Sequence, residues 1–409
     1  MNTQKEFHPV KRVKLGIIGM GKVFALGYKK WFAKYLKRDN FQLVAIAEKN
    51  AKLLKKYSEK YDCKGYEDGF DLLDNADINA ILINTPTWTH APLTIQAAKK
   101  GVHILCEKPL TENSTSSWDV VEMCKKYNVY LQVGLVKRFI PAFQKIKAII
   151  NEGVIGKIFE VEVDWPTYIP NLTKKPYKTF IKRIKQFTGI DLGELIGGWS
   201  LRDKSLGKYG GIFLDHAPHV LDLLRFCLES EVKAVMGTST SLIEGRYDDT
   251  TKGILRFEND TQAYIRTSVY DFQAWLIARL KMCFRGIKGA IMLDYPNTSL
   301  FKSPKSLTLY RENPISNAMK IIETFGLFRG EKIRLRKNYM FLDGLHYFIN
   351  HIRGTRMRHP VFGLEHLAAR GEDGAIATLL VEKIIDNSEL DEPSWMKIKY
   401  DGKWANNSV

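Results

Sequence analysis

The sequence predicts an α/β protein with a doubly wound parallel sheet in its first part and an α+β domain in its second. Up to about residue 135, short apolar runs alternate with helical stretches, which is typical of a parallel sheet between helices. An early strand leads directly into Gly19-Met20-Gly21 and a helix. After residue 135, apolar residues alternate with period two and few long helices intervene, which favours a mostly antiparallel sheet.

The first domain is expected over residues 10–135, since 409 residues are ample for two domains. Its strands are predicted at Val13–Ile18, Phe41–Ala47, Ile78–Asn84, Val102–Cys106 and Val129–Val133. Its helices are predicted from the glycine turn to about Leu36 and at Ala51–Tyr61, Ala91–Lys100 and Thr115–Tyr127. Gly101 directly follows the third helix and is an ordinary helix stop.

The second domain is expected over residues 136–405. Its strands are predicted at Lys157–Val163, Val232–Thr240, Gly253–Phe257, Thr261–Val269, Leu280–Phe284 and Ala290–Leu293. Two late helices are predicted at His346–His351 and Glu372–Asp386. Residues 166–209 form a long insertion rich in lysine, and loops of that length inside a compact domain are usually functional or mobile.

The composition limits the cellular compartment and the kinds of site that we expect. The five cysteines are odd in number and include no Cys-x-x-Cys pair, which argues against a disulfide framework and a cysteine-rich metal site and suggests the cytoplasm. No run of about 18 apolar residues and no apolar leader occur, so we expect neither a membrane span nor a secretory signal. No metal site is predicted.

The formal net charge of +17 favours anionic partners, although an ordinary solvated basic surface explains it equally well. We expect no nucleic-acid partner. Residues 178–187 combine apolar residues at helical spacing with Lys and Arg, so peripheral membrane contact is an alternative, but an ordinary packed helix fits this pattern better.

A dinucleotide site is predicted where the first strand ends. Glycines let a backbone approach a pyrophosphate, and a helix N-terminus offers free N–H groups. Glu48 ends the next strand, where its carboxylate could accept the adenosine ribose hydroxyls and repel a 2′-phosphate, which favours NAD; Lys49 keeps NADP open. The residues expected to bind the dinucleotide here are Gly19, Met20, Gly21, Lys22, Val23 and Glu48.

Three further segments carry residues suited to hydride transfer. Asn84–His90 and Cys106–Leu110 follow strands and lie at the carboxyl edge of the expected sheet, where ligands bind. The third segment is Gly210–Asp222, in which Asp215 and His219 share one face if it is helical. Oxidising an alcohol requires a base for the hydroxyl proton and a cation near the developing alkoxide.

Histidine and lysine supply those two groups. His219 titrates in the range of a base, and Lys108 supplies the charge. Taken alone, His219 would more often be a core residue and Lys108 a solvated one.

Four motifs together carry a family resemblance. They are Gly-Ile-Ile-Gly-Met-Gly, Thr85-Pro86 with His90, Glu107-Lys108-Pro109, and Gly210-Gly211 followed by Asp215 and His219. In this order and spacing the chain resembles the glucose–fructose oxidoreductase and inositol dehydrogenase family (Gfo/Idh/MocA), closely over residues 13–225 and more loosely beyond. Phe24, where members have Gly or Ala, and Glu48, where they have Asp, are departures. The insertion 166–209 is also longer than usual.

The resemblance implies a Rossmann domain followed by an α+β domain with an open, mostly antiparallel sheet, which binds substrate and supports a homo-oligomer, a dimer or tetramer. It implies a catalytic group of Lys108, Asp215 and His219. It further implies that Thr85, Pro86, Thr87, His90, Glu107, Lys108 and Arg138 lie at the cofactor cleft.

The implied activity is hydride transfer between NAD, or NADP, and a secondary alcohol or ketone of a sugar, sugar derivative or cyclic polyol. The lysines of the insertion favour a phosphorylated or nucleotide-linked sugar. The rival hypothesis is an NAD-binding sensor or scaffold without turnover, because fold does not fix function.

Overall fold

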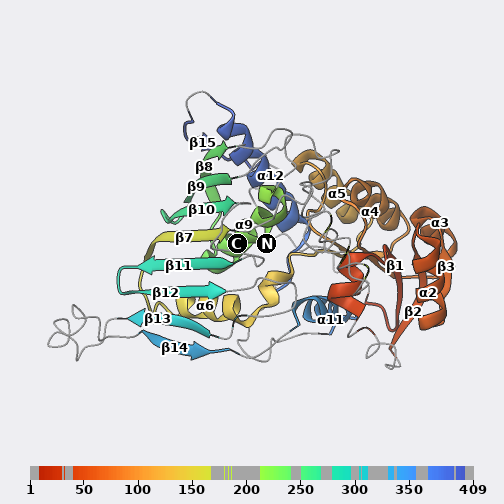
Figure 1. Cartoon of the computed structure of the whole chain (residues 1–409). Coiled ribbons are helices and arrows are strands. Elements are labelled where there is room, and N and C mark those ends of the chain that lie inside the picture. The colour runs from red at the N-terminus through yellow and green to blue at the C-terminus, as the bar shows by residue number, and fades with distance from the viewer. Residues whose placement is uncertain are drawn as a thin grey trace. The chain divides into compact units, whose positions relative to one another are not determined.

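The chain forms two compact units in a computed structural model (Figure 1). The structure describes residues 9–29, 32, 40–166, 179, 183, 186, 212–240, 250–268, 279–295, 304, 306–311, 330–335, 339–355, 367–390 and 393–400. One unit comprises Met1–Ile140, Asn338–Leu379 and Tyr400–Val409, and the other Pro141–Lys337 and Leu380–Lys399. Nearly all of the predicted insertion 166–209 lies outside the described residues.

The N-terminal unit contains a six-stranded parallel sheet of order β3-β2-β1-β4-β5-β6. Its strands are β1 Val13–Ile18, β2 Phe41–Ala47, β3 Lys64–Tyr66, β4 Ala80–Ile83, β5 His103–Cys106 and β6 Leu131–Val133. The strand order reverses between β1 and β4, which confirms the predicted doubly wound sheet. The sequence did not reveal β3, because its three residues form no apolar run.

The described helices of this unit are η1 Phe24–Tyr28, α2 Ala51–Tyr61, α3 Gly69–Asn75, η2 Thr87–Thr89, α4 His90–Lys99, α5 Ser114–Lys126, η3 Val136–Phe139 and α11 Met340–Ile352. Of these, α2, α4 and α5 begin and end within one residue of their predicted bounds, α11 begins six residues before the predicted His346, and α3, η2 and η3 were not predicted. Asn50 caps α2 by accepting the N–H groups of Lys52 and Leu53. Most of the first predicted helix beyond Lys29 falls outside the described residues.

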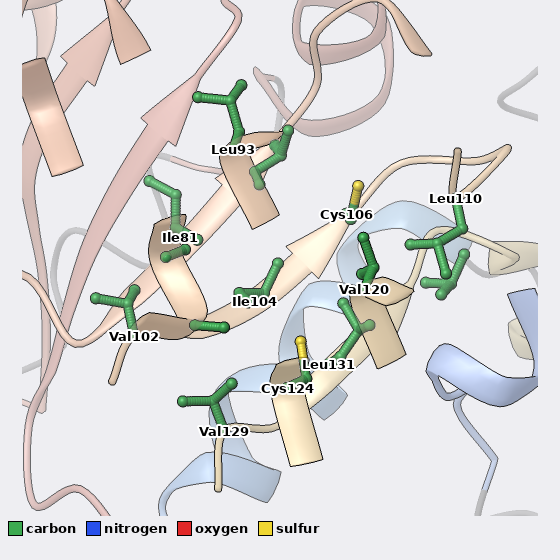
Figure 2. Packing of buried hydrophobic residues seen from close by; sticks show 14 of the residues in the cluster. Ile81, Leu93, Val102, Ile104, Cys106, Leu110, Val120, Cys124, Val129 and Leu131 are labelled. Atoms are coloured by element: carbon green, nitrogen blue, oxygen red, sulfur yellow. The ribbon is translucent and has the colours of Figure 1, made fainter. Parts of the chain in front are cut away.

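The core on one face of this sheet is packed by α3, α4 and α5. Ile81 and Ile104 from the strands meet Leu93 and Val120 from the helices, and all are almost completely buried (Figure 2). Burying each such side chain contributes about 1.5–3 kcal/mol. This face of the strands is therefore covered by helices and is not available to a ligand.

A late segment of the chain completes the same unit. The Phe341 ring of α11 lies against Gly27 of η1, where an added Cβ would come within 2.9 Å of the ring. The Gln132 side chain donates a 3.0 Å hydrogen bond to the carbonyl of Gly344, 212 residues away. The predicted late helix at His346–His351 therefore belongs with the parallel sheet.

The second unit contains a nine-stranded sheet of order β14-β13-β12-β11-β7-β10-β9-β8-β15. Its strands are β7 Ile158–Pro166, β8 Val232–Thr240, β9 Thr250–Phe257, β10 Gln262–Ser268, β11 Leu280–Gly286, β12 Gly289–Tyr295, β13 Ser306–Arg311, β14 Glu331–Arg334 and β15 Met396–Lys397. Only β7 and β10 pair in parallel among these described strands, so the predicted mostly antiparallel sheet is confirmed.

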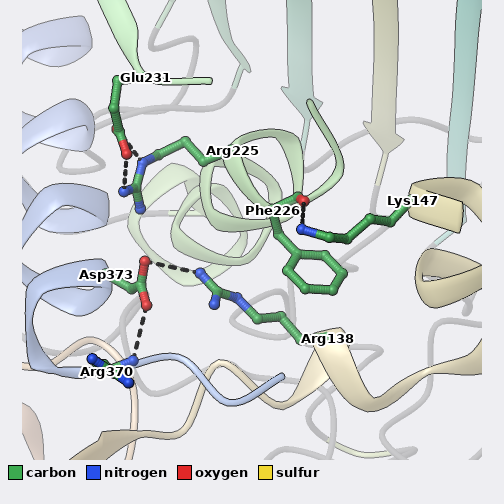
Figure 3. Close-up of polar contacts among 7 residues, drawn as sticks. All are labelled: Arg138, Lys147, Arg225, Phe226, Glu231, Arg370 and Asp373. Atoms are coloured by element: carbon green, nitrogen blue, oxygen red, sulfur yellow. Dashed lines mark hydrogen bonds and ion pairs between the residues drawn. The ribbon is translucent and has the colours of Figure 1, made fainter. Parts of the chain in front are cut away.

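Among the described residues, three helices accompany this sheet: α6 Pro141–Asn151, α9 Ile212–Leu228 and α12 Gly371–Ser388, whose residues up to Leu379 belong to the N-terminal unit. The Lys147 ammonium of α6 donates to the Phe226 carbonyl of α9 at 3.0 Å (Figure 3). At the end of α9, the Arg225 guanidinium grips the Glu231 carboxylate with two 2.6 Å bonds (Figure 3). These contacts fix α9 in its unit. Among the described residues, no helix is both long and apolar enough to cross a bilayer.

Candidate active site

The topology of the parallel sheet gathers three predicted segments at one edge. The Gly19-Met20-Gly21 turn follows β1, the Thr85 turn follows β4, and Glu107-Lys108 follows β5. Because β1, β4 and β5 are neighbours and parallel, their carboxyl ends lie side by side. This edge, next to the reversal of strand order, is where open α/β sheets bind ligands.

The glycine turn has the geometry that a dinucleotide requires. Gly19 has a φ of +90°, and a Cβ there would lie 2.7 Å from the Asn84 carbonyl oxygen, so no other residue fits. Gly21, in contrast, faces open space, since its Cβ would meet no atom within 4 Å. The backbone is therefore exposed where a pyrophosphate would approach, and the residues present fit NAD.

Phe24 occupies the third glycine position without closing this turn. It begins the π-helix η1, in which the Lys29 N–H bonds to the Phe24 carbonyl five residues back. The Phe24 ring lies edge-on to those of Phe32 and Tyr57, with centroids 5.9 and 5.4 Å away. The side chain thus enters a buried aromatic cluster on the inner side. Lys22 and Val23 form the first turn that leads into η1.

Glu48 lies beside the glycine turn and holds it. One carboxylate oxygen accepts the Met20 N–H at 2.8 Å, and the other accepts the Asn50 N–H at 2.9 Å. Each carboxylate oxygen has a further acceptor site. Glu48 can therefore brace the turn and still accept ribose hydroxyls.

His90 joins two loops of the sheet edge. Its ring is 1% exposed, with Nδ1 2.9 Å from the Pro109 carbonyl and Nε2 2.8 Å from the Thr85 carbonyl. Burial lowers the pKa of His90, although these backbone bonds oppose the effect. In the Thr85 turn, the Thr89 hydroxyl donates to the Pro86 carbonyl at 2.7 Å. His90 thus binds the two loops to each other, and Pro86 and Thr87 stay partly exposed beside them.

Glu107 is a buried carboxylate directly before Lys108. One of its oxygens accepts the Tyr28 hydroxyl at 3.1 Å, and the other lies 3.3 Å from the Lys108 backbone nitrogen. Burial raises the pKa of Glu107 to about 7, and the Lys108 charge and the Tyr28 hydrogen bond counteract part of this rise. The Lys108–Pro109 peptide bond is cis.

Arg138 lies in η3 and is also buried. Its guanidinium pairs with the Asp373 carboxylate at 3.0 Å, and the second oxygen of Asp373 accepts the Arg370 N–H at 2.9 Å (Figure 3). Asp373 lies in the first turn of α12, where a carboxylate also interacts favourably with the helix dipole. The observed role of Arg138 is to tie η3 to that turn.

In the second unit, α9 is helical through Asp215 and His219, so these positions share one face of the helix. The Asp215 side chain lies outside the described residues. His219 is 8% exposed, and the Trp165 ring of β7 lies 6.4 Å from it, tilted by 36°. Trp165 also stacks on His216 at 4.2 Å, with planes 9° apart. The Trp165 ring therefore packs against the face of α9 that carries both His216 and His219.

Sequence reasoning missed three of these residues. His216 stands three positions before His219, so helical spacing alone would have placed it on the same face. Trp165 and Tyr28 offered no comparable signal, because their partners are distant in sequence. Within the described part of the chain, no cluster of metal-binding side chains occurs.

Sequence comparison agrees with this geometry. Residues 13–135 match the oxidoreductase family with an NAD-binding Rossmann fold, and residues 143–292 match the GFO/IDH/MocA C-terminal domain. The chain belongs to the Gfo/Idh/MocA oxidoreductases. Its N-terminal unit is an NAD-binding Rossmann domain, as the glycine turn and the strand order predicted.

Curated relatives and solved structures extend the comparison. The myo-inositol 2-dehydrogenase of Thermotoga maritima is 27% identical over 69% of this chain and 75% of its own length. The levoglucosan dehydrogenase of Pseudarthrobacter phenanthrenivorans is 28% identical over 56% of this chain and 55% of its own. The WlbA dehydrogenase of Bordetella pertussis, solved with NADH and UDP-GlcNAcA, has a TM-score of 0.71 at 18% identity, covering 96% of this chain and all of that one. At that identity the likeness shows the fold.

Proposed function

We propose that this oxidoreductase oxidises a secondary alcohol of a sugar, sugar derivative or cyclic polyol, or runs the reverse reduction. The observation that carries the proposal is the placement of Lys108 next to a buried carboxylate at the ligand-binding edge of an NAD-binding sheet. Relatives named for inositol and levoglucosan support this substrate class. The WlbA structure with UDP-GlcNAcA supports a nucleotide-linked sugar as one member of it.

The proposed chemistry divides the work among three side chains. Bound NAD would supply the hydride acceptor, held by the Gly19–Val23 turn, Glu48, and the loops of Thr85–Thr87, His90 and Arg138. Lys108 stabilises negative charge on the substrate oxygen, and His219 takes the hydroxyl proton as the carbonyl forms. Asp215 orients this pair. Substrate binding is assigned to residues 136–405, and dinucleotide binding to residues 10–135.

The protein is further proposed to form a homo-oligomer through the open face of the nine-stranded sheet. Tyr264 pairs in register with Glu162, Glu162 with Cys283, and Cys283 with Met292, so these side chains form one row on one face. Tyr264 and Met292 are 38% and 47% exposed, and Tyr310 of the same face is 42% exposed. Exposed apolar side chains gathered on a flat face are typical of an interface.

A cytoplasmic location is part of the same proposal. All five cysteines are described, none of them forms a disulfide, and three of them are buried. Thiols of this kind suit a reducing compartment.

A panel of polyols, sugars and nucleotide sugars, followed by NADH absorbance, tests the proposed activity. On the substrate found, Lys108→Met should lower turnover about 10²–10³-fold, because a preorganised charge is lost, while NADH quenching of tryptophan fluorescence stays within a few-fold. Lys52→Met, on the exposed side of α2, is the matched control and should behave as wild type. Near-normal turnover of Lys108→Met would refute the mechanism. NADH binding without turnover of any panel member would favour the sensor alternative.

A further inference from the structure

Tyr28 has one well-defined place in the N-terminal unit. It is the last residue of η1, is 2% exposed, and lies edge-on to the Phe341 ring with centroids 5.3 Å apart. Gly27 lets the same ring approach the backbone of η1 directly. Packed between these neighbours, the Tyr28 ring cannot turn away, and its hydroxyl is aimed at the Glu107 carboxylate.

The opposite side of that carboxylate is equally enclosed. Gly134 follows β6, and a Cβ there would lie 2.8 Å from Oε2 of Glu107 and 3.0 Å from its Cα. The Gly134 N–H donates to the Cys106 carbonyl at 2.7 Å, which holds this backbone beside β5. The carboxylate therefore lies in a fitted site made by η1, by Gly134 and by the backbone of Lys108.

A carboxylate in such a site stays ionised only with help. The groups that act on Glu107 are the Lys108 charge, the Tyr28 hydroxyl and the Lys108 N–H, and all three stabilise its charged form. Cys106 on β5 is a buried thiol whose own pKa is raised by burial, so it stays neutral. Tyr28 likewise stays protonated, since burial and Glu107 raise its pKa. When Glu107 is charged, its carboxylate can only accept, so the Tyr28 hydroxyl is the donor of their hydrogen bond.

We propose that Tyr28 is a positioning residue, whose hydroxyl keeps Glu107 in place as a carboxylate so that Glu107 holds the Lys108 ammonium ready for the substrate. This inference rests on the proposed function of Lys108. Tyr28 does not touch the reacting atoms, and it acts through Glu107 alone. The arrangement makes turnover depend on the protonation of a group outside the catalytic set.

The pH effect has a definite sign if Glu107 positions the Lys108 ammonium through its negative charge. Protonation removes that charge, so kcat/KM should fall as the pH drops through about 7. A hydrogen bond to the charged form lowers a pKa, so removing the Tyr28 hydroxyl should raise that of Glu107. The acid limb of the pH profile should then move upward by about one unit, which is about a tenfold loss of kcat/KM on that limb. Well above both values, the two enzymes should converge.

Tyr28→Phe tests the inference with two independent readouts. The first is the titration of the Glu107 carboxyl in the cofactor-free protein by ¹³C NMR of labelled glutamate, assigned by its loss in Glu107→Gln. The second is kcat/KM against pH. Tyr61→Phe is the matched control, because Tyr61 is a buried tyrosine whose hydroxyl has no hydrogen-bond partner among the described residues. It should leave both curves unchanged.

An upward shift in both curves would support the positioning role, and an unchanged Glu107 titration in folded Tyr28→Phe would overturn it. If Tyr28→Phe does not fold, Glu107→Gln decides the question through the pH profile. The contribution of Glu107 to the acid limb should vanish and leave only that of the proposed base His219, so a profile identical to that of the wild type would refute the inference. Wild-type protein that turns over no panel member would refute the proposed function instead, and the NMR titration would still judge the contact between Tyr28 and Glu107.

Discussion

The two sheets of this protein use their faces differently. Every residue of β4 and β5 is buried, so these two strands of the parallel sheet have no free face. Strands β9 and β12 instead alternate buried with exposed or half-exposed residues. A sheet covered on both faces can offer only its strand ends to a ligand, whereas a half-covered sheet can carry a helix on one face and a partner on the other.

This difference explains where the candidate residues come from. Lys108 and Glu107 follow a strand, and the glycine turn follows another. His219 comes from within the helix α9, beside a strand residue, Trp165. The predictions below test whether both kinds of position contribute to one reaction.

The largest expected effect is at α9. His219→Ala should lower turnover about 10²–10⁴-fold through loss of the general base, with NADH binding kept within a few-fold. His351→Ala is the matched control, because His351 is a histidine of α11 whose ring packs against that of Tyr130, and it should keep turnover within about threefold of wild type. Single-turnover rates and fluorescence quenching measure the two quantities. Normal turnover of His219→Ala would show that His219 is not the base. The base would then have to come from a residue at the strand ends of the parallel sheet.

An intermediate effect is expected on the open face of the antiparallel sheet. Met292→Glu places a charge in the row that includes Tyr264, and a two-fold interface would meet that charge twice. The dissociation constant should rise about 30-fold or more, which corresponds to ~2 kcal/mol. Sedimentation velocity over a concentration series measures it.

Phe70→Glu provides the control for that experiment. Phe70 is a similarly exposed apolar residue, but it lies on α3 of the N-terminal unit. Its substitution should leave the oligomer intact. Equal behaviour of the two variants, or a wild-type monomer, would contradict the proposed interface.

The same contrast explains what the sequence could predict. Buried parallel strands appear as continuous apolar runs, so β1 and β2 were predicted with their observed bounds. Short elements with mixed polarity, such as β3 and α3, carry no such run and were missed. The assignment of α11 to the N-terminal unit depends on contacts such as Gln132 with Gly344, and no local pattern encodes those.

The candidate site shows the same limit. Topology rules gathered the strand-end segments correctly, because parallel neighbours share an edge. The contact between Tyr28 and Glu107 joins residues 79 apart, and the bonds of Glu48 depend on how a loop folds back. Residue types at a spacing indicate what chemistry is available, but side-chain partners follow from packing.

The smallest expected effect concerns Glu48, where two roles must be separated. Its carboxylate braces the glycine turn through the Met20 and Asn50 N–H groups. As the proposed ribose ligand, it should also disfavour the 2′-phosphate of NADP. Glu48→Gln deletes the charge but keeps one acceptor oxygen, so it should shift the NAD/NADP preference about tenfold, which is ~1.4 kcal/mol. Because one of the two backbone N–H groups keeps its acceptor, it should lower the free energy of unfolding less than Glu48→Ala does.

Glu48→Ala deletes the acceptors as well. It should shift the preference by a similar factor and also lower the free energy of unfolding by about 1–2 kcal/mol, since two backbone N–H groups lose their partner. Ratios of kcat/KM for the two cofactors and urea unfolding measure these quantities separately. If both variants keep the wild-type cofactor preference while Glu48→Ala is destabilised, Glu48 only braces the turn. The choice between NAD and NADP must then be made by another residue of the sheet edge, and Lys49 is the nearest charged candidate in sequence.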